Sequence, residues 1–103
     1  MNVTKTAFEI NESPLMNVKE VIFKAKESLP MLTNRELDGV TGISKEGNEW
    51  KVTLELIERK SIPDSSDLLG VYELRLDEEG GVVSFNRSRT RKRGDTEDLG
   101  KEI

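Results

Sequence analysis

Neither cysteine nor histidine occurs among the 103 residues of the chain. Without these two residue types the protein has no thiolate nucleophile, no imidazole general base and no zinc site of the Cys/His kind. Most common hydrolytic mechanisms are thereby excluded. We expect no cofactor and no metal, and the carboxylates are the side chains that remain as candidates for a catalytic site.

Long apolar runs are also missing. No run approaches the roughly 20 residues that a membrane-spanning helix requires, and residues 1–5 lack the basic-then-apolar plan of a secretory signal. We expect a cytoplasmic protein without a membrane partner. Apolar residues make up 34% and charged residues 35% of the chain, so its core must be economical, and a chain of this length is expected to form one domain.

The net charge of −4 is unevenly distributed. Residues 87–103 contain six Lys/Arg and four Asp/Glu, a net charge of +2, which leaves −6 for residues 1–86. A protein with this overall sign is repelled by a phosphate backbone except where its one basic cluster makes contact.

The pattern of residues 13–29 predicts an amphipathic helix. Its start is signalled either by Ser13 followed by Pro14 or by Asn17 with Glu20 three residues later, and Pro30 predicts its end near Ser28 or Leu29. Apolar residues recur at spacings of three and four and so share one helix face: Leu15, Val18, Val21, Ile22, Ala25 and Leu29.

Four later segments have the character of strands. Residues 37–44 predict a short strand whose two glycines permit a bulge. Residues 49–59 and 68–77 alternate apolar and polar side chains, and a turn at 77–81 predicts a hairpin to a final strand through Val83 and Phe85. The inward-facing residues predicted for the two alternating strands, and hence for the core, are Trp50, Val52, Leu54, Leu56, Tyr72, Leu74 and Leu76.

These elements predict an α+β fold, with one N-terminal amphipathic helix packed on one face of a curved antiparallel sheet of about four strands. The opposite face of the sheet would be solvated and available to partners. Residues 1–12 are expected to form a flexible arm, residues 13–93 the single domain and residues 94–103 a disordered acidic tail.

Several carboxylates are candidates for a metal or catalytic site. Asp64 and Asp67, with Glu58 nearby, could in principle bind Mg²⁺ or Ca²⁺, but no Asp-x-Asp-x-Asp-Gly loop accompanies them, and an Asp-rich turn is the favoured interpretation. Glu55 with Glu58, or the two aspartates, could form a glycosidase-like pair. Solvated carboxylates at strand ends are the simpler explanation.

The basic cluster is the strongest candidate site for a partner. Alternation along a strand would place Arg87, Arg89, Arg91 and Arg93 on one edge with their charges together, and Lys92 lies among them. Guanidinium groups bind carboxylates and phosphates in bidentate geometry. The alternatives are a solvated strand end, an acidic protein partner, or nucleic acid, for which only Phe85 is close enough to stack on a base.

Short motifs in one order carry a family resemblance. They are Trp50-Lys51-Val52, the Glu-rich run 55–58, Ile62-Pro63-Asp64, the run 67–73 ending in Tyr72-Glu73, and the basic end at 87–93, preceded by a first strand at 37–43. In this order the chain resembles the gas vesicle protein O family, although Thr90 stands where the family's basic end has an aromatic residue.

The resemblance implies an accessory role in building gas-filled protein shells and no enzymatic activity. Its implied partners are other gas vesicle proteins, and its implied location is the cytoplasm in association with gas vesicles. We therefore predict a non-catalytic assembly factor that acts through the exposed sheet face and the arginines. A nucleic-acid-binding regulator using the same arginines is the alternative, and a homodimer through an edge strand stays open.

Overall fold

A computed structural model of the chain describes residues 16–94. The elements in order are α1 (Val18–Thr33), β1 (Glu36–Glu46), β2 (Glu49–Arg59), a 3-10 turn η1 (Asp64–Ser66), β3 (Leu68–Asp77) and β4 (Val82–Lys92). This arrangement of one helix and a four-stranded antiparallel sheet confirms the predicted α+β fold. The predicted arm, and the predicted tail apart from Gly94, lie outside the described residues.

Helix α1 begins at the second of the two predicted start signals. Asn17 Oδ1 accepts a hydrogen bond from the Glu20 amide at 2.9 Å, and the Glu20 carboxylate accepts one from the Asn17 amide at 3.0 Å. This reciprocal capping box satisfies two amides that lack a partner within the helix. Ser13 and Pro14 lie outside the described residues.

The predicted end of the helix at Ser28 or Leu29 is wrong, because α1 continues through Pro30 to Thr33. Leu29 is fully buried in the core, and its carbonyl accepts a hydrogen bond from Thr33 Oγ1 at 2.8 Å. Asn34, in the left-handed conformation with φ 57°, closes the helix by donating its amide to the Pro30 carbonyl at 2.7 Å. Burial and this C-terminal cap outweigh the missing amide of proline.

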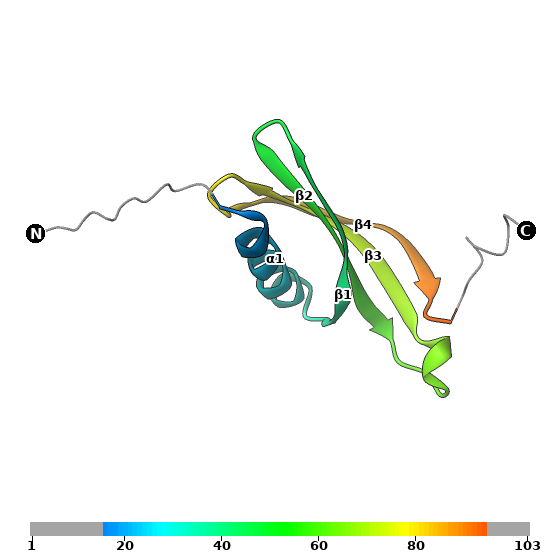
Figure 1. Cartoon of the computed structure of the whole chain (residues 1–103). Coiled ribbons are helices and arrows are strands. Elements are labelled where there is room, and N and C mark those ends of the chain that lie inside the picture. Colours follow the sequence, from blue (N-terminus) through cyan, green and yellow to red (C-terminus); the bar gives the residue numbers. More distant parts are fainter. Residues whose placement is uncertain (1–15, 95–103) are drawn as a thin grey trace, which may run out of the picture.

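The four strands pair in the order β1-β2-β3-β4, each antiparallel to its neighbour, and form a strongly twisted sheet (Figure 1). The bounds of β2 and β3 agree with the predicted strands. Strand β1 is longer than predicted and has two register shifts, near Gly39 and Gly42, as the glycines indicated. Strand β4 is also longer and carries the basic cluster as far as Lys92.

Helix α1 packs over β1, β2 and β3 (Figure 1). We call this side of the sheet the inner face and the other side the outer face. The predicted inward residues of β2 and β3 are confirmed, with Trp50 partly buried at the margin of the core. The buried core comprises Val21, Ala25, Leu29, Val52, Leu54, Leu56, Tyr72, Leu74 and Leu76.

Over residues 16–94, the structure contains no helix with the length and apolar character needed to cross a membrane.

Candidate partner-binding surface

The basic residues of β4 do not lie on one edge, contrary to the sequence prediction. Arg87 pairs with Tyr72 of the inner face, whereas Arg89 pairs with Val71 and Arg91 with Leu69 on the outer face. The register shifts between Arg87 and Arg89 because Ser88 is an extra residue in β4, and such a bulge breaks the two-residue alternation. Ser88 Oγ donates to the Val71 carbonyl at 3.1 Å. The arginines are therefore divided between two faces.

On the inner face, Arg87 belongs to a group centred on Glu58, whose side chain is 6% exposed. Glu58 Oε2 accepts a hydrogen bond from the Tyr72 hydroxyl at 2.7 Å. Its Oε1 lies 3.2 Å from Arg87 Nη1 and 3.3 Å from Arg35 Nη2. We call these four residues the Glu58 cluster. Burial, followed by the contact with Glu58, raises the pKa of the Tyr72 hydroxyl.

Gly70 makes room for the Glu58 cluster. A Cβ atom at this position would collide with the Glu58 carboxylate and approach the Tyr72 ring to 2.9 Å. The absence of a side chain on β3 thus lets Glu58 of β2 reach over that strand toward Arg87 of β4.

On the outer face, Arg91 binds Glu55 in bidentate geometry. Arg91 Nε lies 2.7 Å from Glu55 Oε2 and Arg91 Nη2 lies 2.8 Å from Glu55 Oε1. The Glu55 side chain is only 8% exposed, and Leu69 and Val71 of β3 are buried on the same face. The hydrogen bond to Glu55 raises the pKa of Arg91, and a bidentate, charge-assisted pair of this kind is stronger than a hydrogen bond between neutral groups.

Arg93, which directly follows β4, joins two acidic residues. Its Nη1 lies 2.6 Å from Asp38 Oδ1 and its Nη2 lies 3.1 Å from Asp67 Oδ2. Asp67 is 3% exposed and also accepts the Ser61 amide on Oδ1 at 2.7 Å. The Ser61 hydrogen bond, and then Arg93, lower the pKa of the Asp67 carboxyl.

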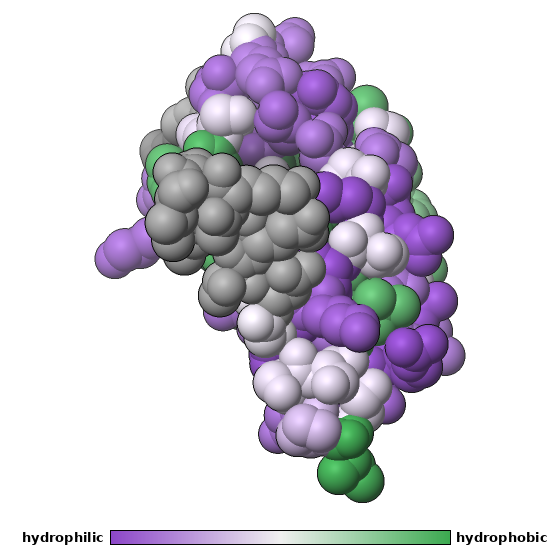
Figure 2. Space-filling model, turned by 90° about the vertical axis from the view of Figure 1, so that its right-hand side faces the viewer, coloured by the Kyte–Doolittle hydropathy of each residue, from purple (hydrophilic) through white to green (hydrophobic). Residues whose placement is uncertain are grey.

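Of the five predicted partner-binding residues, Arg87, Arg91 and Arg93 bind carboxylates of the same domain. Arg89 and Lys92 are exposed residues of β4. Among the described residues, the view onto the right-hand side of Figure 1 shows mostly hydrophilic side chains (Figure 2). The sequence analysis missed Glu55, Glu58 and Asp67 as arginine partners. The signal in the sequence was charge alone: β2 and the turn before β3 contain carboxylates and β4 is basic, although β3 lies between β2 and β4.

The candidate carboxylates are likewise divided between the two faces and the turn before β3. Glu55 binds Arg91 on the outer face and Glu58 binds Tyr72 on the inner face, so the two do not form a glycosidase-like pair. Asp64 is exposed in η1 and Asp67 is bound by Ser61 and Arg93. Within residues 16–94, no group of three or more acidic side chains is arranged to hold a metal ion.

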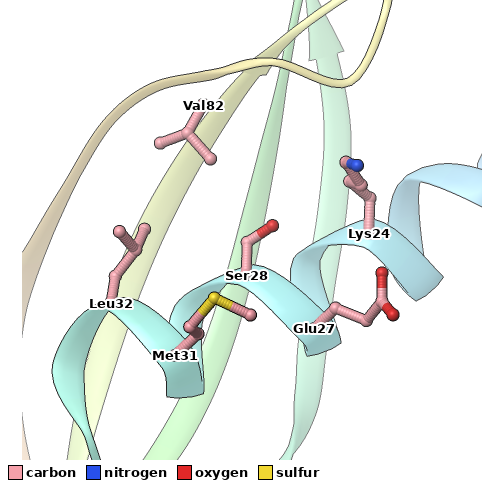
Figure 3. Close-up of a pocket in the computed structure, with 6 residues that line it drawn as sticks. All are labelled: Lys24, Glu27, Ser28, Met31, Leu32 and Val82. Atoms are coloured by element: carbon pink, nitrogen blue, oxygen red, sulfur yellow. The ribbon is translucent and has the colours of Figure 1, made fainter.

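A groove runs between α1 and the start of β4. It encloses about 290 Å³ and is lined by Lys24, Glu27, Ser28, Met31, Leu32 and Val82. Leu32 and Ser28 point from α1 toward Val82, as Figure 3 shows. Phe85 pairs with Leu74 of the core face and is 39% exposed, so it extends this apolar surface along β4.

The chain is similar to proteins of known families. The family model described as gas vesicle synthesis protein GvpO matches residues 5–97. Gas vesicle protein O of Haloferax mediterranei is 32% identical over 88 residues, which cover 82% of this chain and 63% of that protein. Gas vesicle protein O1 of Halobacterium salinarum is 28% identical over 95 residues, covering 89% of this chain and 80% of that protein.

A third relative, gas vesicle protein O of a Streptomyces species, is 31% identical over 74 residues, covering 72% of this chain and 58% of that protein. The chain therefore spans less than two thirds of the length of the Haloferax and Streptomyces proteins. No solved structure matches it significantly. The match of the family model over residues 5–97 confirms the resemblance found in the motifs, and the chain belongs to the gas vesicle synthesis protein GvpO family.

Proposed function

We propose that this protein is an accessory factor in gas vesicle assembly that acts by binding other gas vesicle proteins, in the cytoplasm and at the vesicle. Membership of the gas vesicle synthesis protein GvpO family supports a role in gas vesicle assembly. The observation that supports a binding role is the exposure of strand β4, which includes cationic residues: apart from Arg91, every residue of Val82–Lys92 is exposed.

The cationic side chains that remain accessible on β4 define the binding surface. Lys92 and Arg89 are exposed, and the Arg87 side chain is 50% exposed although it contacts Glu58. Strand β4 has no acidic residue, whereas the chain as a whole carries −4. A partner with acidic side chains is therefore attracted to this strand and repelled elsewhere.

Internal ion pairing favours this role over catalysis. Glu55, Glu58 and Asp67 are the buried or nearly buried carboxylates, and each is bound by an arginine. A carboxylate whose oxygens are bound by an arginine of the same domain is poorly placed to reach a substrate.

Co-purification from cells that express the surrounding gas vesicle genes tests the proposal. The double variant Arg89→Glu/Lys92→Glu reverses the accessible charge of β4 and leaves the Arg91 and Arg93 ion pairs in place. A matched control, Lys19→Glu/Lys26→Glu, makes the same change in net charge on exposed positions of α1.

We expect the tagged wild type and the control to recover gas vesicle proteins and the β4 variant to lose them. Equal recovery by all three proteins would show that the cationic side chains of β4 do not bind the partner. Recovery of RNA in place of proteins, with binding that falls steeply with salt, would favour the nucleic-acid-binding regulator. Recovery of nothing from cells that do assemble vesicles would contradict the binding role itself.

A further inference from the structure

Strand β4 forms an open edge of the sheet. In the order β1-β2-β3-β4 it pairs with β3 on one side, and no described strand pairs with its other side. The strand is 11 residues long, longer than the usual 5–6 residues of a strand. An edge of this length presents a row of backbone amides and carbonyls to which an additional strand can bind.

The charges of the two edge strands indicate what can bind there. Strand β4 carries Arg87, Arg89, Arg91 and Lys92 and no acidic residue, whereas β1 carries three acidic residues and one lysine. Like charges placed opposite one another destabilise a strand pair. A second β4 from another copy of the chain is therefore disfavoured at this edge, and an acidic strand is favoured.

The groove beside β4 favours a partner strand that also carries apolar side chains. Helix α1 packs mainly over β1, β2 and β3, so the inner face of β4 remains exposed at Val82 and Phe85. Alternate side chains of a strand added next to Val82 would point toward the inner face, where the groove borders Leu32 and Met31 (Figure 3). The other side chains would point toward the outer face, where Arg89 and Arg91 lie.

We propose that the β4 edge binds an extended segment of a partner protein as a fifth strand of the sheet. The segment has acidic side chains beside the exposed cationic residues Arg89 and Lys92 of β4 and large apolar side chains entering the groove between α1 and β4. The identity of that partner as a gas vesicle protein rests on the proposed function. The mode of binding rests only on the edge, its charge and the groove.

Hydrogen exchange of the full chain with a synthetic peptide that alternates Glu with Leu and Val tests this mode. Amides of β4 that do not bond to β3 exchange rapidly in the free chain, and peptide should slow them at least about tenfold. Two control peptides separate the contribution of side-chain charge from that of backbone hydrogen bonds. One replaces Glu with Lys, and the other keeps every side chain but is N-methylated at alternate residues, which removes the backbone donors along one edge.

We expect neither control peptide to protect β4, and we expect protection by the first peptide to weaken with added salt. A matched pair of surface variants probes the groove. Leu32→Gln should reduce peptide affinity on the order of tenfold, because an apolar contact is lost. Phe23→Gln changes an exposed apolar residue of the same helix that does not line the groove and should leave affinity unchanged.

Several results would overturn the proposal. They are an absence of β4 protection at millimolar peptide, equal protection by the N-methylated peptide, and protection by single-stranded RNA alone. Slow exchange of the β4 edge in the free chain would mean that the edge is already occupied. The occupant is a second copy of the chain if the exchange rate depends on protein concentration, and the chain's own residues if it does not. If the peptide binds but no gas vesicle proteins co-purify, only the proposed function is overturned. If gas vesicle proteins co-purify but the peptide does not bind, only the strand addition is overturned.

Discussion

The two ends of the sheet are stabilised by different chemistry. At the end beneath α1, β2 and β3 contribute fully buried Val52, Leu54, Leu74 and Leu76. At the other end, β2 and β4 are joined across β3 by Glu55–Arg91 and Glu58–Arg87. Two strands that flank a third lie almost 10 Å apart, a span that long glutamate and arginine side chains can bridge.

The comparison explains why one strand contains so many arginines. The charged end of the sheet also contains the buried residues Leu69 and Val71, and charged side chains with long aliphatic portions lie across both of its faces. Arginine suits this role because its planar group binds a carboxylate with two parallel hydrogen bonds, as between Arg91 and Glu55. A basic run that resembles a binding site in the sequence is thus used in large part within the domain.

The largest effect is expected from the apolar end. Leu54→Ala removes a fully buried side chain from the middle of the core and should lower the free energy of unfolding by about 3–4 kcal/mol. Urea denaturation followed by circular dichroism measures this loss. A loss below about 1 kcal/mol would show that the helix-covered end is not the principal source of stability.

Removing an ion pair should have the next largest effect. Arg91→Gln leaves the buried Glu55 carboxylate without its bidentate partner and should cost about 2–3 kcal/mol, reduced from the fully buried case because Arg91 is partly exposed. Lys92→Gln, at the exposed neighbouring position, is the control and should change stability by less than about 0.5 kcal/mol. Equal losses of stability in Arg91→Gln and Lys92→Gln would contradict the conclusion that Arg91 stabilises the domain more than Lys92 does.

A smaller loss of stability is expected from a substitution at Gly70, where β3 has no side chain. Gly70→Ala places a Cβ against the Glu58 carboxylate and the Tyr72 ring and should cost about 1–2 kcal/mol. The effect should shrink in a Glu58→Ala background, because the main obstacle is then gone. Thermal unfolding of the two single variants and the double variant measures this coupling, and additive losses would show that Gly70 does not serve Glu58.

The smallest expected effect depends on pH. Asp67 has a pKa below its ordinary value of about 3.9, first because of the Ser61 amide and then because of Arg93. Its stabilising contribution is therefore present above pH 4 and is lost as the pH falls through the lowered pKa of the folded state.

In Asp67→Asn, the urea midpoint should fall less between pH 5 and about pH 2 than in the wild type. A residual fall is expected because the hydrogen bond from Arg75 also lowers the pKa of Glu46. Parallel midpoint curves for the two proteins would contradict the assignment to Asp67.

Much of the fold was predictable because its signals are local. The alternation of Trp50, Val52, Leu54 and Leu56 predicted both the bounds and the inner face of β2, and the Asn17–Glu20 spacing was one of the two predicted signals for the helix start. The helix end was not predictable from Pro30, because burial of Leu29 and the cap at Asn34 depend on the folded core.

The candidate site was harder to predict because it depends on register. A strand from Arg87 to Arg93 with strict alternation places its arginines together, and only the extra residue at Ser88 moves Arg87 to the other face. The pairing of Arg91 with Glu55 links residues 36 positions apart across an intervening strand, which no local pattern reveals. The family was nevertheless accessible from the sequence, since its motifs are short and ordered.

A double-mutant cycle on Glu55 and Arg91 tests the central claim most directly, namely that the arginines of β4 stabilise the charged end of the sheet. Glu55→Gln, Arg91→Gln and the double variant are compared with the wild type by urea denaturation. The structure predicts a coupling free energy of about 1.5–3 kcal/mol for this pair. A coupling below about 0.5 kcal/mol, the value typical of an exposed surface pair, would contradict it.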